Sequence, residues 1–366
     1  MGKKIRNLIC TVCFIAFMAV LIGAFALKEP VDILVSERRK AAQFPKFSIS
    51  AVMDKSFFDG FENYLTDQFP LRDGFRAVKA AISMKIFGQK DNGGTFIANG
   101  HISEITASLK EDSVKNAAEK INSIYDKYLD GKANKIYFSI VPDKNFYLAE
   151  KNGYPSLDYG KMAEIMKADL GRLEYIDITD CLSLDSYYRT DSHWKQEKIG
   201  AVVQKLGKAM GFSISESYSE DNLGKFDGVY ASRFAFGTES DNMICLRNKI
   251  TDSAKVFNAE TNKSSVGVYN AEKLKGNDKY DVFFSGAVSV ISAENPFFEG
   301  KKELVIFRDS FGSSLAPLLL EGYSKITLVD TRYISPSVLG EFVDFENCDV
   351  LFIYNTTLLN QSNMLK

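Results

Sequence analysis

The amino-acid sequence predicts an α/β protein in which a parallel sheet is covered by helices, preceded by an apolar helix that anchors the chain in a membrane. Two observations support this prediction. From about residue 95 to the carboxyl end, short apolar runs alternate with segments of helical periodicity, which is the rhythm of β-α-β units. The first 27 residues are different, because a basic segment is followed by a long apolar one.

The composition is that of an ordinary globular protein. The chain has 366 residues, of which 45% are hydrophobic and 25% are charged, so it can bury one large core or two smaller ones. The formal net charge is −2. Because nucleic-acid binding normally requires a basic face or stripe, we expect no nucleic-acid partner.

The amino-terminal segment predicts a single-pass membrane protein. Residues 7–27 are almost wholly apolar, close to the ~20 residues that a helix needs to span a bilayer. Lys3, Lys4 and Arg6 precede this run and should stay in the cytoplasm, which places the rest of the chain outside the cell. Residues 24–26 also fit a signal-peptidase site, and cleavage after Ala26 is the alternative. We favour the uncleaved anchor because the apolar run is long for a signal peptide.

The cysteines do not define a metal site or a disulfide framework. Cys10 and Cys13 lie in the apolar segment, which leaves Cys181, Cys245 and Cys348, an odd and widely spaced set. Their spacing matches no zinc motif. We interpret these cysteines as small buried hydrophobic residues. The serine and histidine chemistry considered below needs no metal and no cofactor, and we expect neither.

The expected elements follow one another in a regular order. We predict an anchor at residues 1–27, a tether at 28–47 and one α/β domain at 48–366. Apolar residues at helical spacing predict helices at 57–69, 78–87, 113–129, 159–173, 194–210, 311–320 and 336–345. Short apolar runs bounded by turn residues predict strands at 95–98, 135–141, 175–178, 303–307, 326–330 and 350–354. Residues 212–276 are rich in Ser, Asn, Asp and Gly, and we expect them to form an irregular or β-rich insertion at the rim of the site.

Ser310 lies between an expected strand and an expected helix. A side chain on such a turn stands at the carboxyl edge of a sheet, where α/β proteins place their sites. The N–H groups at the start of the helix favour a developing negative charge, and Gly312 allows close packing. The alternative is that Ser310 only caps the helix.

A histidine that can serve as a base lies upstream. The chain has only two histidines, and His101 is expected in a turn, so His193 is the candidate base near neutral pH. Asp191 can orient its ring. Alternatively, Asp191 is a helix cap and His193 an ordinary loop residue. Trp194 could pack in the core, wall the pocket or hold the histidine ring. A metal site at Asp191 and His193 would lack further His or Cys ligands.

Several motifs together resemble a known family. Thr-Asp-Ser-His-Trp at 190–194 and Arg-Asp-Ser-Phe-Gly at 308–312 resemble the DHHW proteins of Gram-positive bacteria. These proteins are grouped with the AlgJ/AlgX-type alginate O-acetyltransferases in the SGNH hydrolase-like superfamily. Residues 57–72, 141–144 and 330–333 also resemble family motifs, so the resemblance extends from about residue 36 to 358.

The resemblance implies an SGNH hydrolase-like sheet with a circularly permuted order of motifs. It implies that Ser310 is the nucleophile, His193 the base and Asp191 the orienting acid. Asn355 falls where such sites place an oxyanion donor, and Arg332 falls where the family keeps an arginine near the site.

The chain departs from the family pattern at two positions. Ser192 stands where the family name implies a second histidine, and Arg308 stands where the glycine of a Gly-Asp-Ser motif is expected. No glycine obviously supplies the second oxyanion donor. Gly286 is a candidate, with packing in a tight turn as its alternative.

The function implied is O-acetyl transfer to an exported surface polysaccharide. Acetyl donors are cytoplasmic, so a membrane-bound acyltransferase is expected as the partner that passes the acyl group across the membrane. A carbohydrate esterase with the same triad is an alternative, since only the acceptor differs. A non-catalytic scaffold or binding protein of the cell envelope is the alternative from another class.

Overall fold

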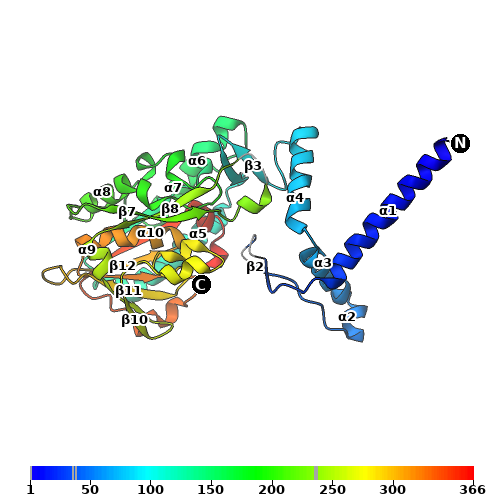
Figure 1. The fold of residues 1–366 in the computed structure, drawn as a ribbon. Helices are drawn as coiled ribbons and strands as arrows, with labels where there is room; N and C mark the ends of the chain where they lie inside the picture. The colour runs from blue at the N-terminus through cyan, green and yellow to red at the C-terminus, as the bar shows by residue number, and fades with distance from the viewer. Residues whose placement is uncertain (1, 35–36, 38, 235–237) are drawn as a thin grey trace. The chain divides into compact units, whose positions relative to one another are not determined.

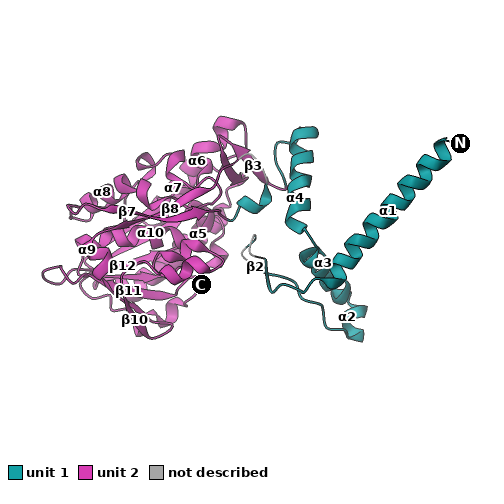
Figure 2. Cartoon of the chain, in the orientation of Figure 1, with its two compact units in different colours: residues 1–92, 229–237 teal, residues 93–228, 238–366 magenta. Residues whose placement is uncertain are grey.

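A computed structural model describes residues 2–34, 37, 39–234 and 238–366. Residues 35, 36 and 38 of the expected tether, and 235–237 of the expected insertion, lie outside the described residues. The chain divides into two compact units, which Figure 2 distinguishes by colour. Unit 1 comprises residues 1–92 and 229–237, and unit 2 comprises 93–228 and 238–366. This division falls at residue 92, whereas the sequence predicted that the α/β domain starts at residue 48.

Unit 1 is largely helical (Figure 1). Its helices are α1 (Gly2–Leu27), α2 (Ile49–Met53), α3 (Ser56–Gln68) and α4 (Arg72–Ala81), and its short strands are β1 (Ile33–Leu34) and β2 (Arg39–Lys40). Helix α1 is long and apolar enough to cross a membrane, and none of it is buried in the protein. Helix α3 ends two residues before Pro70, as the sequence predicts, because proline interrupts the helical hydrogen bonds.

Unit 2 contains an eight-stranded sheet in the order β10-β9-β11-β13-β12-β14-β5-β6. The strands are β5 (Lys135–Val141), β6 (Glu174–Tyr175), β9 (Lys255–Asn258), β10 (Lys263–Val266), β11 (Val290–Glu294), β12 (Glu303–Arg308), β13 (Lys325–Val329) and β14 (Cys348–Asn355). The strands from β13 to β6 run parallel, whereas β11, β9 and β10 join by antiparallel pairing. Two hairpins, β3 (Thr95–Ala98) with β4 (His101–Glu104) and β7 (Ser219–Phe226) with β8 (Asp241–Arg247), lie outside this sheet.

Alternating side chains of the strands fill two cores, one on each face of the sheet. In β12, Leu304 and Ile306 belong to one core and Val305 and Phe307 to the other. The first core includes residues of α8 (Gly200–Ala209) and α10 (Ser310–Leu319). The second includes residues of α5 (Glu111–Ile124) and α7 (Tyr159–Asp169). The predicted α/β fold with a mostly parallel sheet and an amino-terminal apolar helix is confirmed.

Several predicted boundaries differ from the structure. The helix expected to begin at Trp194 begins at Gly200, because the preceding residues form a loop and a short 3₁₀ turn. The helix expected at 336–345 is a 3₁₀ helix, Pro336–Glu341. The insertion is β-rich, and two of its strands, β9 and β10, extend the main sheet. The other α-helices of the described residues are the short α6 (Asn145–Leu148), α9 (Lys249–Ser253) and α11 (Thr356–Leu359).

Candidate active site

Ser310 is the first residue of α10 and lies just after β12. Asp309 is the N-cap, and its carboxylate accepts hydrogen bonds from the backbone N–H of Phe311 (3.0 Å) and of Asn355 (2.7 Å). The second bond ties the carboxyl ends of β12 and β14 together. Burial raises the pKa of Asp309. The side chain of Ser310 remains partly exposed, so an acyl group can reach its hydroxyl.

The loop that carries His193 is closed on itself and tied to the end of β5. Tyr187 and Trp194 pair as an isolated bridge, and the N–H of Tyr188 donates to the carbonyl of His193 (3.1 Å). The hydroxyl of Tyr187 donates to the carbonyl of Pro142 (2.5 Å). These bonds fix the backbone at both ends of the loop.

The structure brings Asp191, His193 and Ser310 together, although 117 positions separate the histidine from the serine. His193 Nε2 lies 2.6 Å from Ser310 Oγ, and His193 Nδ1 lies 2.6 Å from Asp191 Oδ1. The same carboxylate oxygen accepts the backbone N–H of His193 (3.1 Å). Asp191 is fully buried. A serine, a histidine and a carboxylate in this order have the geometry that serves covalent acyl transfer.

Aromatic rings hold the imidazole of His193 in place. The ring of Tyr280 stacks on it with centroids 4.0 Å apart and an interplanar angle of 14°, and Phe311 contacts it at 5.1 Å. The hydroxyl of Ser314 lies 2.7 Å from that of Tyr280 and accepts the indole N–H of Trp194 (2.8 Å). Trp194 is itself fully buried, so it supports the site from the protein interior, and Tyr280 is the ring that holds the histidine.

Lys144 is a buried lysine whose side chain binds the loop backbone. Its Nζ donates to the carbonyls of Asp191 (2.7 Å), Tyr188 (3.1 Å) and Arg189 (3.3 Å). Burial lowers the pKa of Lys144 to about 7. The segment after β5 therefore positions the loop that carries Asp191 and His193.

Asp143, beside Lys144, ties the same segment to other elements. Its carboxylate accepts hydrogen bonds from the hydroxyls of Tyr159 (2.8 Å) and Thr356 (2.9 Å). Tyr159 begins α7 and Thr356 begins α11. The end of β5 is thus fixed from two sides.

The predicted oxyanion donors have different surroundings. The backbone N–H of Ser310 stands at the amino terminus of α10, where no preceding turn of helix offers it a carbonyl. The side-chain amide of Asn355 donates one bond to the carbonyl of Val141 (3.1 Å) and its oxygen caps α11. The N–H of Gly286 donates to the carbonyl of Phe283 (3.0 Å), so this N–H is already engaged within its turn.

Gly286 and Arg332 are both linked to a cluster of charged side chains, Arg308 and Asp330, beside the turn that carries Ser310. Arg308 donates to the Gly286 carbonyl (2.9 Å) and to Asp330 (3.2 Å), and Arg332 makes two bonds to Asp330 (2.9 and 2.7 Å). Gly286 has a φ of +76°, and a Cβ there would overlap the Asp281 carboxylate. In place of the expected glycine, Arg308 thus anchors the turn of residues 283–286 to the end of β13.

Three residues that hold the site have no role in the sequence-based prediction. Lys144 lies in one of the motifs, but its burial cannot be seen in the sequence. Asp309 lies beside the serine as a helix cap. Tyr280 lies outside every motif, and no sequence signal points to it.

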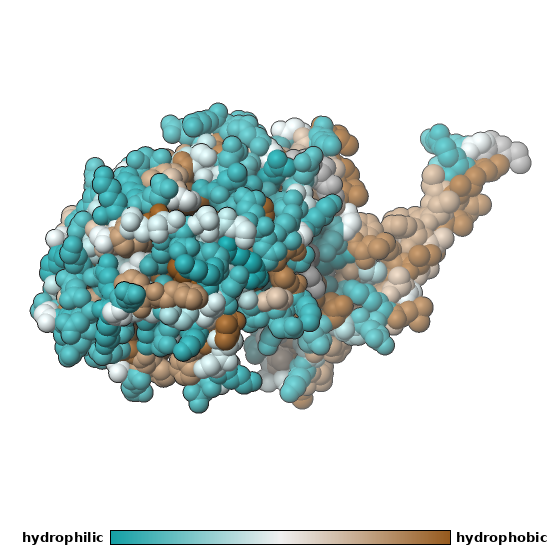
Figure 3. All heavy atoms as spheres, turned by 60° about the vertical axis from the view of Figure 1, so that its left-hand side comes forward, coloured by the Kyte–Doolittle hydropathy of each residue, from teal (hydrophilic) through white to brown (hydrophobic). Residues whose placement is uncertain are grey.

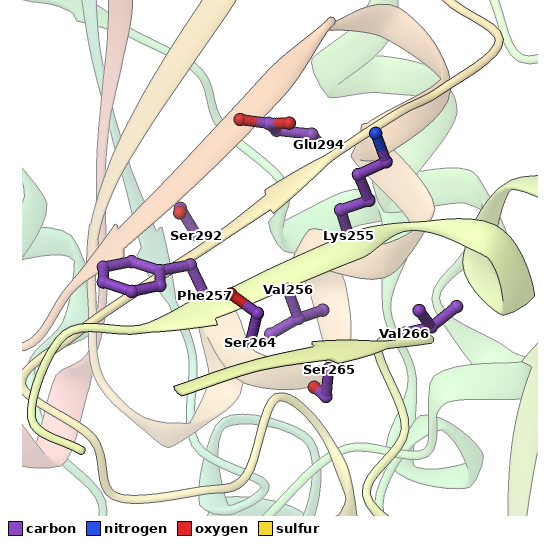
Figure 4. A pocket seen from close by; sticks show the side chains of 8 residues that line it. All are labelled: Lys255, Val256, Phe257, Ser264, Ser265, Val266, Ser292 and Glu294. Carbon is purple, nitrogen blue, oxygen red and sulfur yellow. The ribbon is translucent and has the colours of Figure 1, made fainter. Parts of the chain in front are cut away.

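A hollow lies elsewhere on unit 2, over the antiparallel part of the sheet (Figure 4). It has a volume of about 410 Å³, and its lining includes Phe257, Ser264, Ser292 and Glu294. The residues Asp191, His193 and Ser310 do not line it. Among the described residues, no group of three or more His, Cys, Asp or Glu side chains is arranged to hold a metal ion.

The site and the fold together define a class of α/β proteins with a serine at the carboxyl edge of a parallel sheet. The sequence model of the DHHW protein family matches residues 37–138 and 159–329. The chain therefore belongs to the DHHW family, and the predicted membership is confirmed.

Solved structures are similar in fold. A DHHW family protein from Eubacterium siraeum is 20% identical, with a TM-score of 0.61, over 75% of this chain and 94% of that one. PatB1 of Bacillus cereus, solved with a sulfonyl adduct, is 13% identical, with a TM-score of 0.55, over 72% and 95%. The O-acetyltransferase domain of Pseudomonas putida AlgJ is 10% identical, with a TM-score of 0.44, over 73% and 92%. No curated protein matches the chain.

Proposed function

We propose that the protein is a membrane-anchored serine O-acetyltransferase that acts outside the cell on a surface polysaccharide. The observation that carries this proposal is the hydrogen-bonded series Asp191–His193–Ser310 at the amino terminus of α10. Membership of the DHHW family and the motif resemblance to alginate O-acetyltransferases support acetyl as the acyl group and a polysaccharide as the acceptor.

The geometry supports a two-step transfer. His193 Nε2 takes the proton of Ser310 as its oxygen attacks the acetyl carbonyl, and Asp191 stabilises the imidazolium that forms. The oxyanion develops near the Ser310 N–H, with the Asn355 amide as the second donor. His193 then returns the proton to the leaving group. In the second step, a sugar hydroxyl gives its proton to His193 and attacks the acetyl carbonyl, the bond to the Ser310 oxygen breaks, and His193 passes the proton to that oxygen.

The same proposal assigns α1 as the membrane anchor. Lys3, Lys4 and Arg6 remain in the cytoplasm, and unit 2 lies outside the cell. A membrane-bound acyltransferase would deliver the acetyl group. Protease added to intact protoplasts should degrade unit 2, and its protection would contradict this topology.

The test is covalent labelling of the purified full-length protein in detergent. A small activated acetyl ester should add one acetyl group to Ser310, and a sulfonyl fluoride should block it by sulfonylating the same oxygen with loss of fluoride. Ser310→Ala should lower the labelling rate by at least about 10⁴-fold. Ser313→Ala is the matched control, because this buried neighbour on α10 has no hydrogen-bond partner among the described residues. Labelling that persists in Ser310→Ala would refute the proposal.

Esterase and scaffold functions give other results in the same assay. If the protein is a transferase, added surface polysaccharide speeds the loss of the label and the acetyl group appears on sugar. If it is an esterase, the acetyl group goes to water at an unchanged rate. If it is a non-catalytic envelope protein, no activated ester labels Ser310.

A further inference from the structure

Unit 1 exposes a set of large apolar side chains between residues 44 and 58, here called the apolar collar. Their exposed fractions are 59% for Phe44, 72% for Phe47, 78% for Ile49, 79% for Met53 and 55% for Phe58. Soluble proteins seldom expose apolar side chains in such a contiguous group unless the group binds something.

The collar is a connected surface rather than a scatter of single residues. Ile49 and Met53 are four residues apart on α2 and therefore lie on the same helix face. Phe57 joins the three phenylalanines of the collar, because its ring contacts Phe44 (6.5 Å), Phe47 (5.5 Å) and Phe58 (5.7 Å).

The collar is attached to the carboxyl-terminal end of α1. The ring of Tyr64 on α3 contacts Phe25 near the end of α1 (5.9 Å) and also contacts Phe44 of the collar (5.4 Å). Just after α1, Lys28 Nζ donates to the Gln68 carbonyl (3.1 Å). One tyrosine thus links the end of the apolar helix to the collar.

The distribution of polar and apolar groups along helix α1 is that of a membrane span. Figure 3 shows hydrophobic atoms along its length and a hydrophilic group near its free end. If α1 crosses the bilayer with its basic end inside, Phe25 lies at the outer interface, where tyrosine side chains are also favoured. The contacts of Tyr64 then bring the collar to the level of the outer leaflet.

We infer that the apolar collar inserts into the outer leaflet of the membrane, so that unit 1 binds a phospholipid surface in addition to the span of α1. The helices α2 and α3 lie at the interface, with Phe47, Ile49 and Met53 among the acyl chains and the polar residues of α3 in the headgroup region. The inference rests on the proposed anchoring by α1 and goes beyond the proposed chemistry.

The test uses the full-length protein in phosphatidylcholine vesicles whose acyl chains carry bromine at either a shallow or a deep position. Bromine quenches tryptophan on contact, and the chain has a single tryptophan, Trp194, which is buried in unit 2 and gives a constant background. The variants Phe47→Trp and Met53→Trp report the collar. Phe17→Trp reports α1, and Phe297→Trp, at a half-exposed position of unit 2, reports adsorption at other surfaces.

We expect each kind of variant to respond differently, measured as tryptophan emission above the wild-type background. Phe47→Trp and Met53→Trp should lose their added emission mainly with shallow bromine. Phe17→Trp should lose it mainly with deep bromine, and Phe297→Trp should keep it with both.

Other outcomes overturn the inference. If Phe17→Trp is quenched while the two collar variants are not, α1 crosses the membrane but the collar does not insert into it. If no variant is quenched, α1 does not cross the membrane and the collar does not insert into it. Equal quenching in Phe297→Trp overturns the inference in favour of non-specific adsorption. A collar signal that follows protein concentration rather than bromine overturns it in favour of a second copy of the chain.

Discussion

The parallel and the antiparallel parts of the main sheet differ in burial and in where their strands end. Strand β14 is buried throughout, whereas β10 is exposed throughout. In the parallel part, β5, β12, β13 and β14 all finish at one edge, and Asp143, Asp309, Asp330 and Asn355 stand there within two residues of the strand ends or at them. In the antiparallel part, β9, β10 and β11 alternate in direction, so their ends alternate between the two edges.

The consequence is visible in the hydrogen bonds. At the parallel edge, the carboxylate of Asp309 accepts the N–H of Asn355, and Arg308 donates to Asp330. Over the antiparallel strands, Glu294 pairs in register with residue 255, and serine hydroxyls border a hollow (Figure 4). Both parts offer serines, but among the described residues only Ser310, beside the parallel edge, lies within hydrogen-bond distance of a histidine.

The largest effect that tests this comparison comes from Asp191→Asn. An asparagine there places an amide where the carboxylate accepts from His193 Nδ1, so the imidazole is held in the wrong tautomer. We expect the rate of Ser310 acetylation to fall by about 10⁴-fold while the protein stays folded. Asp185→Asn, at an exposed aspartate in the same segment, should leave the rate unchanged. An unchanged rate in Asp191→Asn would show that the carboxylate has no part in the chemistry.

The next effect comes from Lys144→Met, which removes the donor to three loop carbonyls. Buried carbonyls that lose their partner should lower the free energy of unfolding by about 2–4 kcal/mol. The exposed Lys151→Met is the control. Chemical denaturation followed by far-UV circular dichroism measures both variants, and equal stability of the two would contradict the structural role of Lys144.

The pH dependence of that stability has a definite sign. The pKa of Lys144 is about 7 in the fold, below its ordinary 10.5, so between these values the unfolded chain binds a proton that the folded chain does not. The free energy of unfolding should therefore rise with pH above about 7, by up to about 1.4 kcal/mol per pH unit from this group. Lys144→Met should lack this contribution. Equal slopes in the two proteins would mean that Lys144 titrates normally.

The parallel strands of the main sheet could be predicted from the sequence, but strand β11 and the pairing of the antiparallel strands could not. The run 135–141 is a strand with the predicted bounds, because a continuous apolar run bounded by turn residues is a local signal. The pairing of β9 with β11 joins residues 255–258 to 291–294. Such pairing depends on contacts distant in sequence, and the insertion gives no local sign of it.

The candidate site likewise contains residues that could be predicted from the sequence and residues that could not. Ser310, His193 and Asp191 could be chosen because their motifs are local and their chemistry is distinctive, and their catalytic roles stay a prediction. Tyr280 could not be found, because it lies between the insertion and the next predicted strand, where no sequence pattern distinguishes a tyrosine. Trp194 was expected to pack, to wall the pocket or to hold the ring, and only its burial and its hydrogen bond within the core separate these alternatives.

A smaller effect is expected from Gly228→Ala. A Cβ at Gly228 would overlap the Cβ of Asp191 and the carbonyl of Thr190, so the loop must shift or strain. Overpacking of this kind costs about 1–3 kcal/mol, and the acetylation rate should fall with it because Asp191 moves. Gly200→Ala is the matched control, since a Cβ there meets open space. A thermal unfolding midpoint equal to the wild-type value would argue against the tight approach of the two backbones.

The smallest effect is expected from Ser292→Ala in the hollow over the antiparallel strands. Its acetylation rate should be compared with that of Ser314→Ala, which replaces a serine beside the histidine. Ser314 receives the Trp194 indole N–H and lies 2.7 Å from the Tyr280 hydroxyl, so its loss leaves buried polar groups without partners beside the histidine and should slow acetylation. Ser292 is only partly buried, and substitutions at such positions usually change stability by less than about 0.5 kcal/mol. Its acetylation rate with a small ester should equal that of the wild type. If Ser292→Ala slows acetylation as strongly as Ser314→Ala, the antiparallel strands contribute to the chemistry, and the contrast between the two parts of the sheet is wrong.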